Sequence, residues 1–122
     1  MKEVLLVGVG GFAGSIARYL VSKLNVSWQL LAIPMGTLTV NILGSLLIGL
    51  LVGLSAKSNL ISNELRLLLM VGFCGGFTTF SSFTNENLML MQNGQFLTVL
   101  LYSAISITLG FLAVYLGYIL AS

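Results

Sequence analysis

The sequence predicts an all-α integral membrane protein with four transmembrane helices per chain, and two observations carry this prediction. Of the 122 residues, 57% are hydrophobic and only 7% are charged, whereas soluble domains carry roughly 25% charged residues. Apolar stretches also recur at about the 20 residues that a helix needs to cross a bilayer core of about 30 Å. Four such spans use most of the chain, so we expect residues 1–122 to form one membrane domain.

The first two spans are separated by a polar connection. We place span one from about Val4 to Leu24 and the connection from Asn25 to about Ala32. The connection includes Trp28, a residue type enriched at membrane interfaces. Pro34 opens span two, because proline is tolerated in a first helical turn, and this span continues to about Leu54.

The last two spans are joined by a short turn. A polar connection, Ala56–Glu64, leads into span three, which we place from about Leu65 to Met91. The turn Gln92–Gln95 leads into span four, which ends near Leu120. Glycines four residues apart let helix backbones approach closely in lipid. Three pairs have this spacing and predict helix packing: Gly10 with Gly14, Gly49 with Gly53, and Gly72 with Gly76.

A break is predicted inside span three. Gly75-Gly76 is followed by Thr78-Thr79, and glycine and threonine are poor helix formers. At membrane depth, a broken helix is tolerated only where protein or a cavity satisfies the freed backbone groups. Such breaks are also common places for transported or structural ions.

Polar and aromatic residues near this break form the candidate site. Asn41 lies well inside span two, where an amide without a partner is costly. Phe80 and Phe83 are three residues apart and therefore share a helix face. Each has two interpretations: Asn41 lines a pore or joins two helices, and the phenylalanines line a pathway or only pack. The hydroxyls of Ser81, Ser82 and Thr84 lie beside them in the sequence.

The positive charges are almost evenly divided between the two sides of the membrane. Four spans place Lys2, Lys57 and Arg66 on one side, and Arg18 and Lys23 on the other. This is almost no positive-inside bias. The chain could therefore insert in both orientations and form an antiparallel homodimer, although a single lysine could also fix one orientation.

The composition excludes several function classes. The chain has no histidine, so no nucleophile–histidine pair can be assembled and an enzyme is not expected. Cys74 is the only cysteine, which excludes an intrachain disulfide and a cysteine-rich metal site. The net charge of +2 is too small to indicate binding to nucleic acid.

Three motifs resemble the Fluc (CrcB) family of bacterial fluoride channels, and the resemblance extends over the whole chain. Span one carries Gly11-x-x-Gly14-Ser15-x-x-Arg18-Tyr19, and span two carries Gly36-Thr37-Leu38-x-Val40-Asn41-x-x-Gly44. The most specific match is Gly75-Gly76-x-Thr78-Thr79-Phe80-Ser81-Ser82-Phe83-Thr84-x-Glu86 in span three.

The resemblance implies an antiparallel, dual-topology homodimer in the cell inner membrane, surrounded by lipid, with two pathways for passive fluoride export. It implies that Phe80 and Phe83 line the pathways, with Asn41 donating to the ion. Tyr102 and Ser106 resemble the start of the family's polar track, but Gly110 stands where another hydroxyl is expected. A structural sodium ion is expected at the break, bound by the backbone carbonyls of Gly75 and Thr78.

Two other functions remain open from the residues alone. A small four-span multidrug exporter needs a carboxylate within the membrane, but Glu3 is terminal and Glu64 and Glu86 lie towards span ends. A non-transporting membrane assembly subunit would use the polar residues only to join helices. Fluoride flux from the purified protein separates a channel from both.

Overall fold

The structure is a computed structural model that describes residues 1–23 and 33–122. Within these residues, four helical stretches are long and apolar enough to cross a membrane: Lys2–Lys23, Met35–Lys57, Asn63–Gln92 and Phe96–Ala121. The four predicted spans are therefore confirmed by length and composition. The predicted connection Asn25–Ala32, including Trp28, lies entirely outside the described part of the chain.

The observed helices begin and end within three residues of their predicted bounds, and α2 shows the largest difference. It ends at Lys57 and not at Leu54. Pro34 precedes the first helical residue of α2, with φ −71° and ψ 93°, and does not occupy the first helical position itself. The elements are α1 (Lys2–Lys23), α2 (Met35–Lys57), α3 (Asn63–Arg66), the π-helical segment η1 (Leu67–Cys74), α4 (Gly75–Phe77), α5 (Ser81–Gln92) and α6 (Phe96–Ala121).

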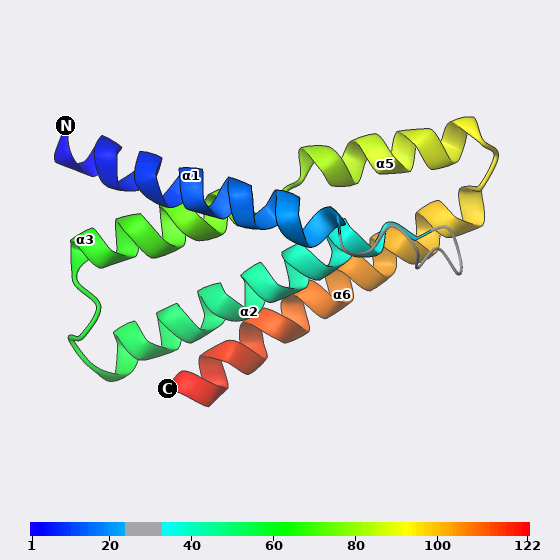
Figure 1. Cartoon of the computed structure of the whole chain (residues 1–122). Coiled ribbons are helices and arrows are strands. Elements are labelled where there is room, and N and C mark those ends of the chain that lie inside the picture. The colour runs from blue at the N-terminus through cyan, green and yellow to red at the C-terminus, as the bar shows by residue number, and fades with distance from the viewer. Residues whose placement is uncertain (24–32) are drawn as a thin grey trace.

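The helices are arranged as two parallel pairs. The α2 and α6 helices lie side by side along their length, and α1 packs against η1 and α4 (Figure 1). Both termini lie at the end of the molecule where α3 begins (Figure 1), and Lys2 Nζ lies 3.0 Å from Glu64 Oε2 there. At the opposite end, the turn between α5 and α6 contains Gly94, whose φ of 74° favours glycine.

Glycines bring the backbones within each pair into contact. A Cβ atom on Gly49 of α2 would meet the carbonyl oxygen of Val114 in α6. A Cβ atom on Gly14 of α1 would likewise meet the carbonyl oxygen of Phe73 in η1. The packing role predicted from the four-residue spacing is therefore confirmed for these helices.

The predicted unwinding at Gly75-Gly76 is wrong in position. Both glycines are in α4, and Gly75 has helical φ and ψ of −62° and −37°. Residues 78–80 are the ones that lie outside any helix, between α4 and α5. Glycine is required at position 76 because a Cβ atom there would lie 2.6 Å from the carbonyl oxygen of Gly11 in α1. Close packing against α1 thus outweighs the weak helix propensity of glycine.

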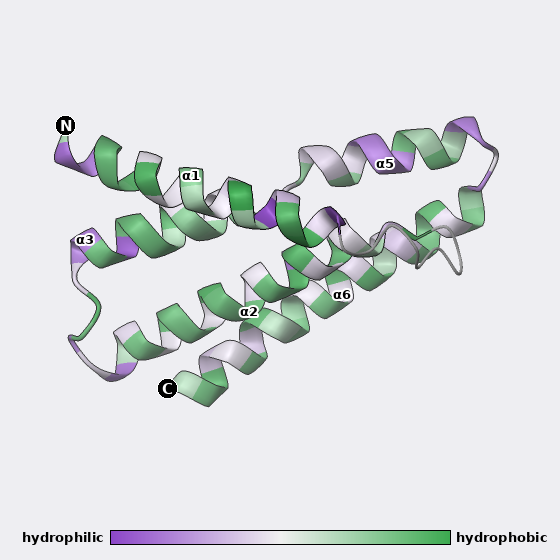
Figure 2. Ribbon diagram, viewed as in Figure 1, coloured by the Kyte–Doolittle hydropathy of each residue, from purple (hydrophilic) through white to green (hydrophobic). Residues whose placement is uncertain are grey.

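The exterior of the four spans is largely apolar, with one polar region on α5. Figure 2 shows hydrophobic residues along most of α1, α2 and α6 and a hydrophilic band within α5. A buried cluster joins α5 to α2 and α6 and consists of Ile33, Leu38, Leu90 and Tyr102, with Phe83 packed against it. This cluster packs α5 against the α2–α6 pair.

Candidate functional site

The side chain of Asn41 binds the backbone of the non-helical residues. Its Oδ1 accepts from the Thr79 N–H at 2.8 Å, and its Nδ2 donates to the Thr79 carbonyl at 3.1 Å. Thr79 follows a helix end, so its backbone groups lack helical partners. Asn41 therefore joins α2 to the non-helical residues between α4 and α5. One of the two hydrogens on Nδ2 is still available to another acceptor.

Two backbone N–H groups at the break, those of Thr79 and Ser82, do not donate to the carbonyls that a continuous helix would give them. In a continuous α-helix, the Thr79 N–H would donate to the Gly75 carbonyl and the Ser82 N–H to the Thr78 carbonyl. Here Thr79 N–H donates to Asn41, and Ser82 N–H donates to Thr79 Oγ1 at 3.1 Å. The carbonyls of Gly75 and Thr78 therefore lose these two helical donors.

Neighbouring carbonyls have other donors. Thr78 N–H and Thr78 Oγ1 both donate to the Cys74 carbonyl, at 3.0 and 2.8 Å. The guanidinium of Arg18 reaches across from α1 and donates through Nε to the Gly76 carbonyl at 3.0 Å. Among the described residues, no group of three or more His, Cys, Asp or Glu side chains could hold a metal ion. A cation at this place would therefore depend on backbone oxygen.

An aromatic row extends from the break into the buried cluster. The rings of Phe80 and Phe83 have centroids 5.8 Å apart, and those of Phe83 and Tyr102 are 5.0 Å apart with planes inclined by 54°. These spacings are typical of paired aromatic rings. The Phe80 side chain is 76% exposed in the single chain, whereas Tyr102 is fully buried.

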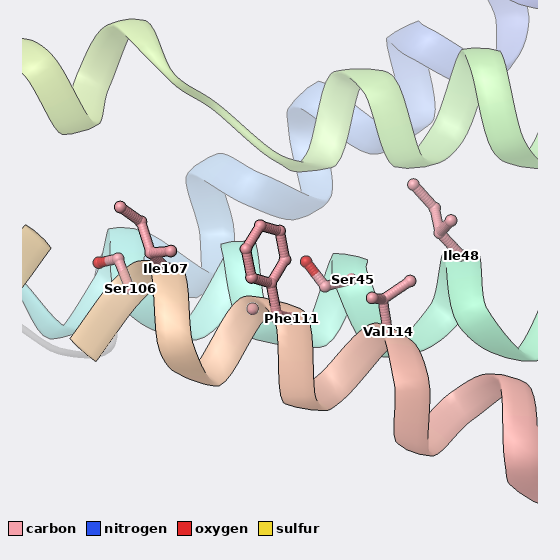
Figure 3. Close-up of a pocket in the computed structure, with 7 residues that line it drawn as sticks. Ser45, Ile48, Ser106, Ile107, Phe111 and Val114 are labelled. Carbon is pink, nitrogen blue, oxygen red and sulfur yellow. The ribbon is translucent and has the colours of Figure 1, made fainter. Parts of the chain in front are cut away.

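A cavity of about 150 Å³ lies between these rings and the α2–α6 pair, and it is lined by Asn41, Ser45, Phe80, Phe83, Ser106, Ile107 and Gly110. It shares Asn41, Ser45 and Phe80 with a second cavity, of about 270 Å³, that reaches Thr78 and Thr79. A third cavity, of about 300 Å³, shares Ser45 and Ser106 with the first and extends to Phe111 and Val114 (Figure 3). The lining residues of all three carry no formal charge.

The predicted site residues are only partly brought together. Asn41, Phe80, Phe83 and Ser106 all line the first cavity. Ser81 and Ser82 line none of the three cavities; Ser81 Oγ lies 3.3 Å from Thr79 Oγ1 instead.

Tyr102 is also occupied elsewhere, because its hydroxyl donates to Glu86 Oε1 at 2.8 Å. The ring of Tyr102, and not its proton, is therefore what faces Phe83.

A carboxylate network near the cavity was missed by the sequence analysis. Thr37 Oγ1 donates to Glu86 Oε2 at 2.7 Å, and Tyr102 donates to the other oxygen. The three residues come from α2, α5 and α6, so Glu86 joins three helices. Glu86 is part of the span-three motif, but its partners are 49 and 16 residues away in sequence, and no local pattern indicates them.

Comparison with known proteins identifies relatives along nearly the whole chain. The family described as "CrcB-like protein, Camphor Resistance (CrcB)" matches residues 5–118. A protein from Azobacteroides pseudotrichonymphae is 48% identical over 120 residues, covering 98% of this chain and 96% of the relative. One from Chlorobium chlorochromatii is 51% identical over 119 residues, covering 98% and 92%.

A third relative, from Flavobacterium psychrophilum, is 41% identical over 121 residues and covers 99% and 98%. All three relatives are named "Fluoride-specific ion channel FluC". Because the family match and these identities extend over almost the full length, the chain belongs to the CrcB-like protein family.

Proposed function

We propose that this chain is a fluoride-selective ion channel that exports fluoride passively across the bacterial inner membrane, and that it is not an enzyme. The observation that carries the proposal is the cavity shared by the amide of Asn41, the rings of Phe80 and Phe83, and the hydroxyl of Ser106. The names of the relatives agree with this function.

The chemistry of the cavity suits a small, strongly hydrated anion. A pathway must replace lost water with other hydrogen-bond donors, and amide and hydroxyl groups are such donors. Aromatic rings add their electropositive edges. Conduction also requires that each site bind the ion only moderately, so that the ion can leave. A cavity without lysine or arginine meets this requirement.

Passive flux is sufficient for export. Hydrogen fluoride enters a cell from acid surroundings as a neutral molecule and dissociates inside. The membrane potential, negative inside, then favours exit of the anion by about 2.3 kcal/mol per 100 mV.

The working unit is an antiparallel homodimer. Three features support it: the nearly even division of positive charges, the 76% exposure of Phe80 in the single chain, and the open surface at Gly75, where an added Cβ would meet nothing within 4 Å. A second copy would cover Phe80 and close the cavity, and lipid would cover the remaining apolar exterior.

Orientation is tested with single cysteines at opposite ends. Ser58→Cys and Asn93→Cys, each combined with Cys74→Ser to remove the native cysteine, are labelled from outside sealed vesicles with a membrane-impermeant reagent. Dual topology predicts partial labelling of both variants, whereas full labelling of one and none of the other would contradict it.

A structural sodium ion at the dimer axis is held by the backbone carbonyls of Gly75 and Thr78. Its support is the diversion of the Thr79 and Ser82 N–H groups, which leaves these two carbonyls without their helical donors. Carbonyl oxygen suits a hard cation, and two chains would supply four such oxygens. The Arg18 guanidinium on the Gly76 carbonyl opposes a divalent ion at the same place.

The sodium proposal is tested by purifying the protein with a large organic cation in place of sodium. We expect loss of dimer stability and of flux, both restored by sodium. Equal stability and flux in both buffers would contradict a structural sodium ion.

The channel proposal is tested with purified protein in liposomes loaded with potassium fluoride. Fluoride should leave rapidly once valinomycin lets potassium leave with it, without any imposed proton gradient. A requirement for a proton gradient would favour a proton-coupled exporter, and no release at all would favour an assembly subunit. Either result would overturn the proposal.

A further inference from the structure

Ser45 connects all three cavities of the candidate site. It lies in α2, one turn after Asn41, and it lines the cavity at the phenylalanines, the cavity at Thr78 and Thr79, and the one that extends towards Val114. Helical serines in lipid commonly donate to a carbonyl of the preceding turn. Ser55, in the same helix, does so at 2.9 Å to the Leu51 carbonyl. No such bond is found for Ser45 within the described residues.

Across from Ser45, α6 forms the other wall of the first and third cavities, and it offers a second free hydroxyl. Ser106 Oγ is buried and has no hydrogen-bond partner within the described chain. One turn further along α6, Gly110 leaves the wall without a side chain. A Cβ atom there would lie 3.8 Å from Ser45 Oγ, so the Ser45 hydroxyl faces the space beside Gly110. Figure 3 shows Ser45 on α2 and Ser106 on α6 along this cavity.

The buried Ser106 hydroxyl lacks a partner within the described chain, which is costly, and the half-buried Ser45 makes no side-chain hydrogen bond there either. Two such hydroxyls beside one uncharged cavity indicate that a ligand accepts their hydrogens. We propose that Ser45 is a further donor on this path, and that it binds a small, partly dehydrated anion together with Ser106 as the anion moves from Asn41 and the phenylalanines towards Gly110. This inference rests on the proposed channel function. Ser45 supplies, from α2, the hydroxyl that α6 lacks at Gly110.

Binding of the anion between the Ser45 and Ser106 hydroxyls suits conduction, because it avoids a full positive charge as the first cavity does. Hydroxyls donate without a full charge, so an anion bound between them is held moderately and can move on. Asn41 and Ser45 are four residues apart on one helix and both line the first cavity. An anion can therefore pass from the amide to the hydroxyl while it keeps at least one donor.

The test uses Ser45→Ala, with Ser55→Ala as the matched control in the same helix. Removing one donor to a charged ligand should slow fluoride efflux from liposomes roughly tenfold, whereas Ser55→Ala should conduct like the unaltered chain. The double variant Ser45→Ala/Gly110→Ser returns a hydroxyl to the same space from α6. It should restore most of the flux, which a merely structural role of Ser45 would not predict.

Four outcomes are informative. Unchanged flux in folded Ser45→Ala would overturn this inference while leaving the channel proposal intact, because the unaltered chain still conducts. Failure of the double variant to improve on Ser45→Ala would also overturn it. If Ser45→Ala does not fold, Ser45→Cys, which keeps the volume but donates weakly, should show the same loss, and normal flux there would contradict the proposal. Absence of fluoride flux in the unaltered chain would overturn both proposals.

Discussion

Replacing Asn41 with aspartate changes one atom group and tests both roles of this residue. The remaining carboxylate oxygen can still accept from the Thr79 N–H, as Oδ1 does now at 2.8 Å. The second oxygen would replace Nδ2 at 3.1 Å from the Thr79 carbonyl oxygen. A donor–acceptor pair thus becomes a pair of acceptors, and the hydrogen of Nδ2 that remains for the cavity is also lost.

The magnitude follows from the groups left without partners. A net hydrogen bond contributes about 0.5–1.5 kcal/mol, and leaving a carbonyl unsatisfied costs about 1–3 kcal/mol. The residues after α4 are therefore destabilised by roughly 1.5–4.5 kcal/mol. This is below the roughly 5–15 kcal/mol that stabilises a typical fold. We expect the four spans to assemble, with the segment around Thr79 displaced and fluoride flux abolished.

The assay combines size-exclusion chromatography, thermal unfolding in detergent and fluoride efflux from liposomes. Asn93→Asp, in the exposed turn before α6, is the matched control because it adds the same charge away from the cavity. It should conduct normally. Undiminished flux in a properly assembled Asn41→Asp protein would show that Asn41 only joins helices and would refute its role in the pathway.

Four further substitutions give expected results from single contacts. Phe80→Ile or Phe83→Ile keeps apolar volume but removes a ring edge from the cavity, so folded protein should conduct much more slowly in the efflux assay. Tyr102→Phe removes the donor to Glu86 at 2.8 Å and should lower stability by about 1.5–3 kcal/mol in thermal unfolding, with a smaller effect on flux than Phe83→Ile. Gly14→Ala places a methyl group on the carbonyl of the neighbouring helix and should destabilise the fold by about 1–3 kcal/mol.

Each of these substitutions has a matched control elsewhere in the chain. Phe12→Ile changes a ring that is 71% exposed on α1 and should leave flux unchanged. Tyr118→Phe removes a hydroxyl from a ring that is 40% exposed near the end of α6. Gly8→Ala adds a methyl group where nothing lies within 4 Å. Normal flux in both Phe80→Ile and Phe83→Ile would show that these rings only pack against their neighbours. Equal stability of Gly14→Ala and Gly8→Ala would contradict the close approach of α1 to η1.

The spans and their packing surfaces were predictable because their signals are local. Apolar length alone locates a membrane span, and the four-residue spacing of Gly10 and Gly14 indicates a packing face. Both depend on residues that are neighbours in sequence. The expected position of the break failed for a related reason: glycine propensity is a weak local preference, and the contact of Gly76 with Gly11 in α1 overrides it.

The contacts of the site were less predictable, because they join residues far apart in sequence. Asn41 was identified as a costly amide, but its partner Thr79 is 38 residues away. The carboxylate of Glu86 was placed towards a span end, and nothing local indicated that Thr37 and Tyr102 would bind it. The role of Ser45 depends on the empty space at Gly110 across the helix pair, which only the three-dimensional arrangement reveals.

The central claim is selectivity for fluoride, and the reversal potential measures it most directly. Purified protein in a planar bilayer is placed between equal concentrations of sodium fluoride and sodium chloride. The account predicts a current carried by fluoride alone, with a large reversal potential of the sign that fluoride selectivity requires. A reversal potential near zero would mean that chloride passes as readily as fluoride and would contradict the account.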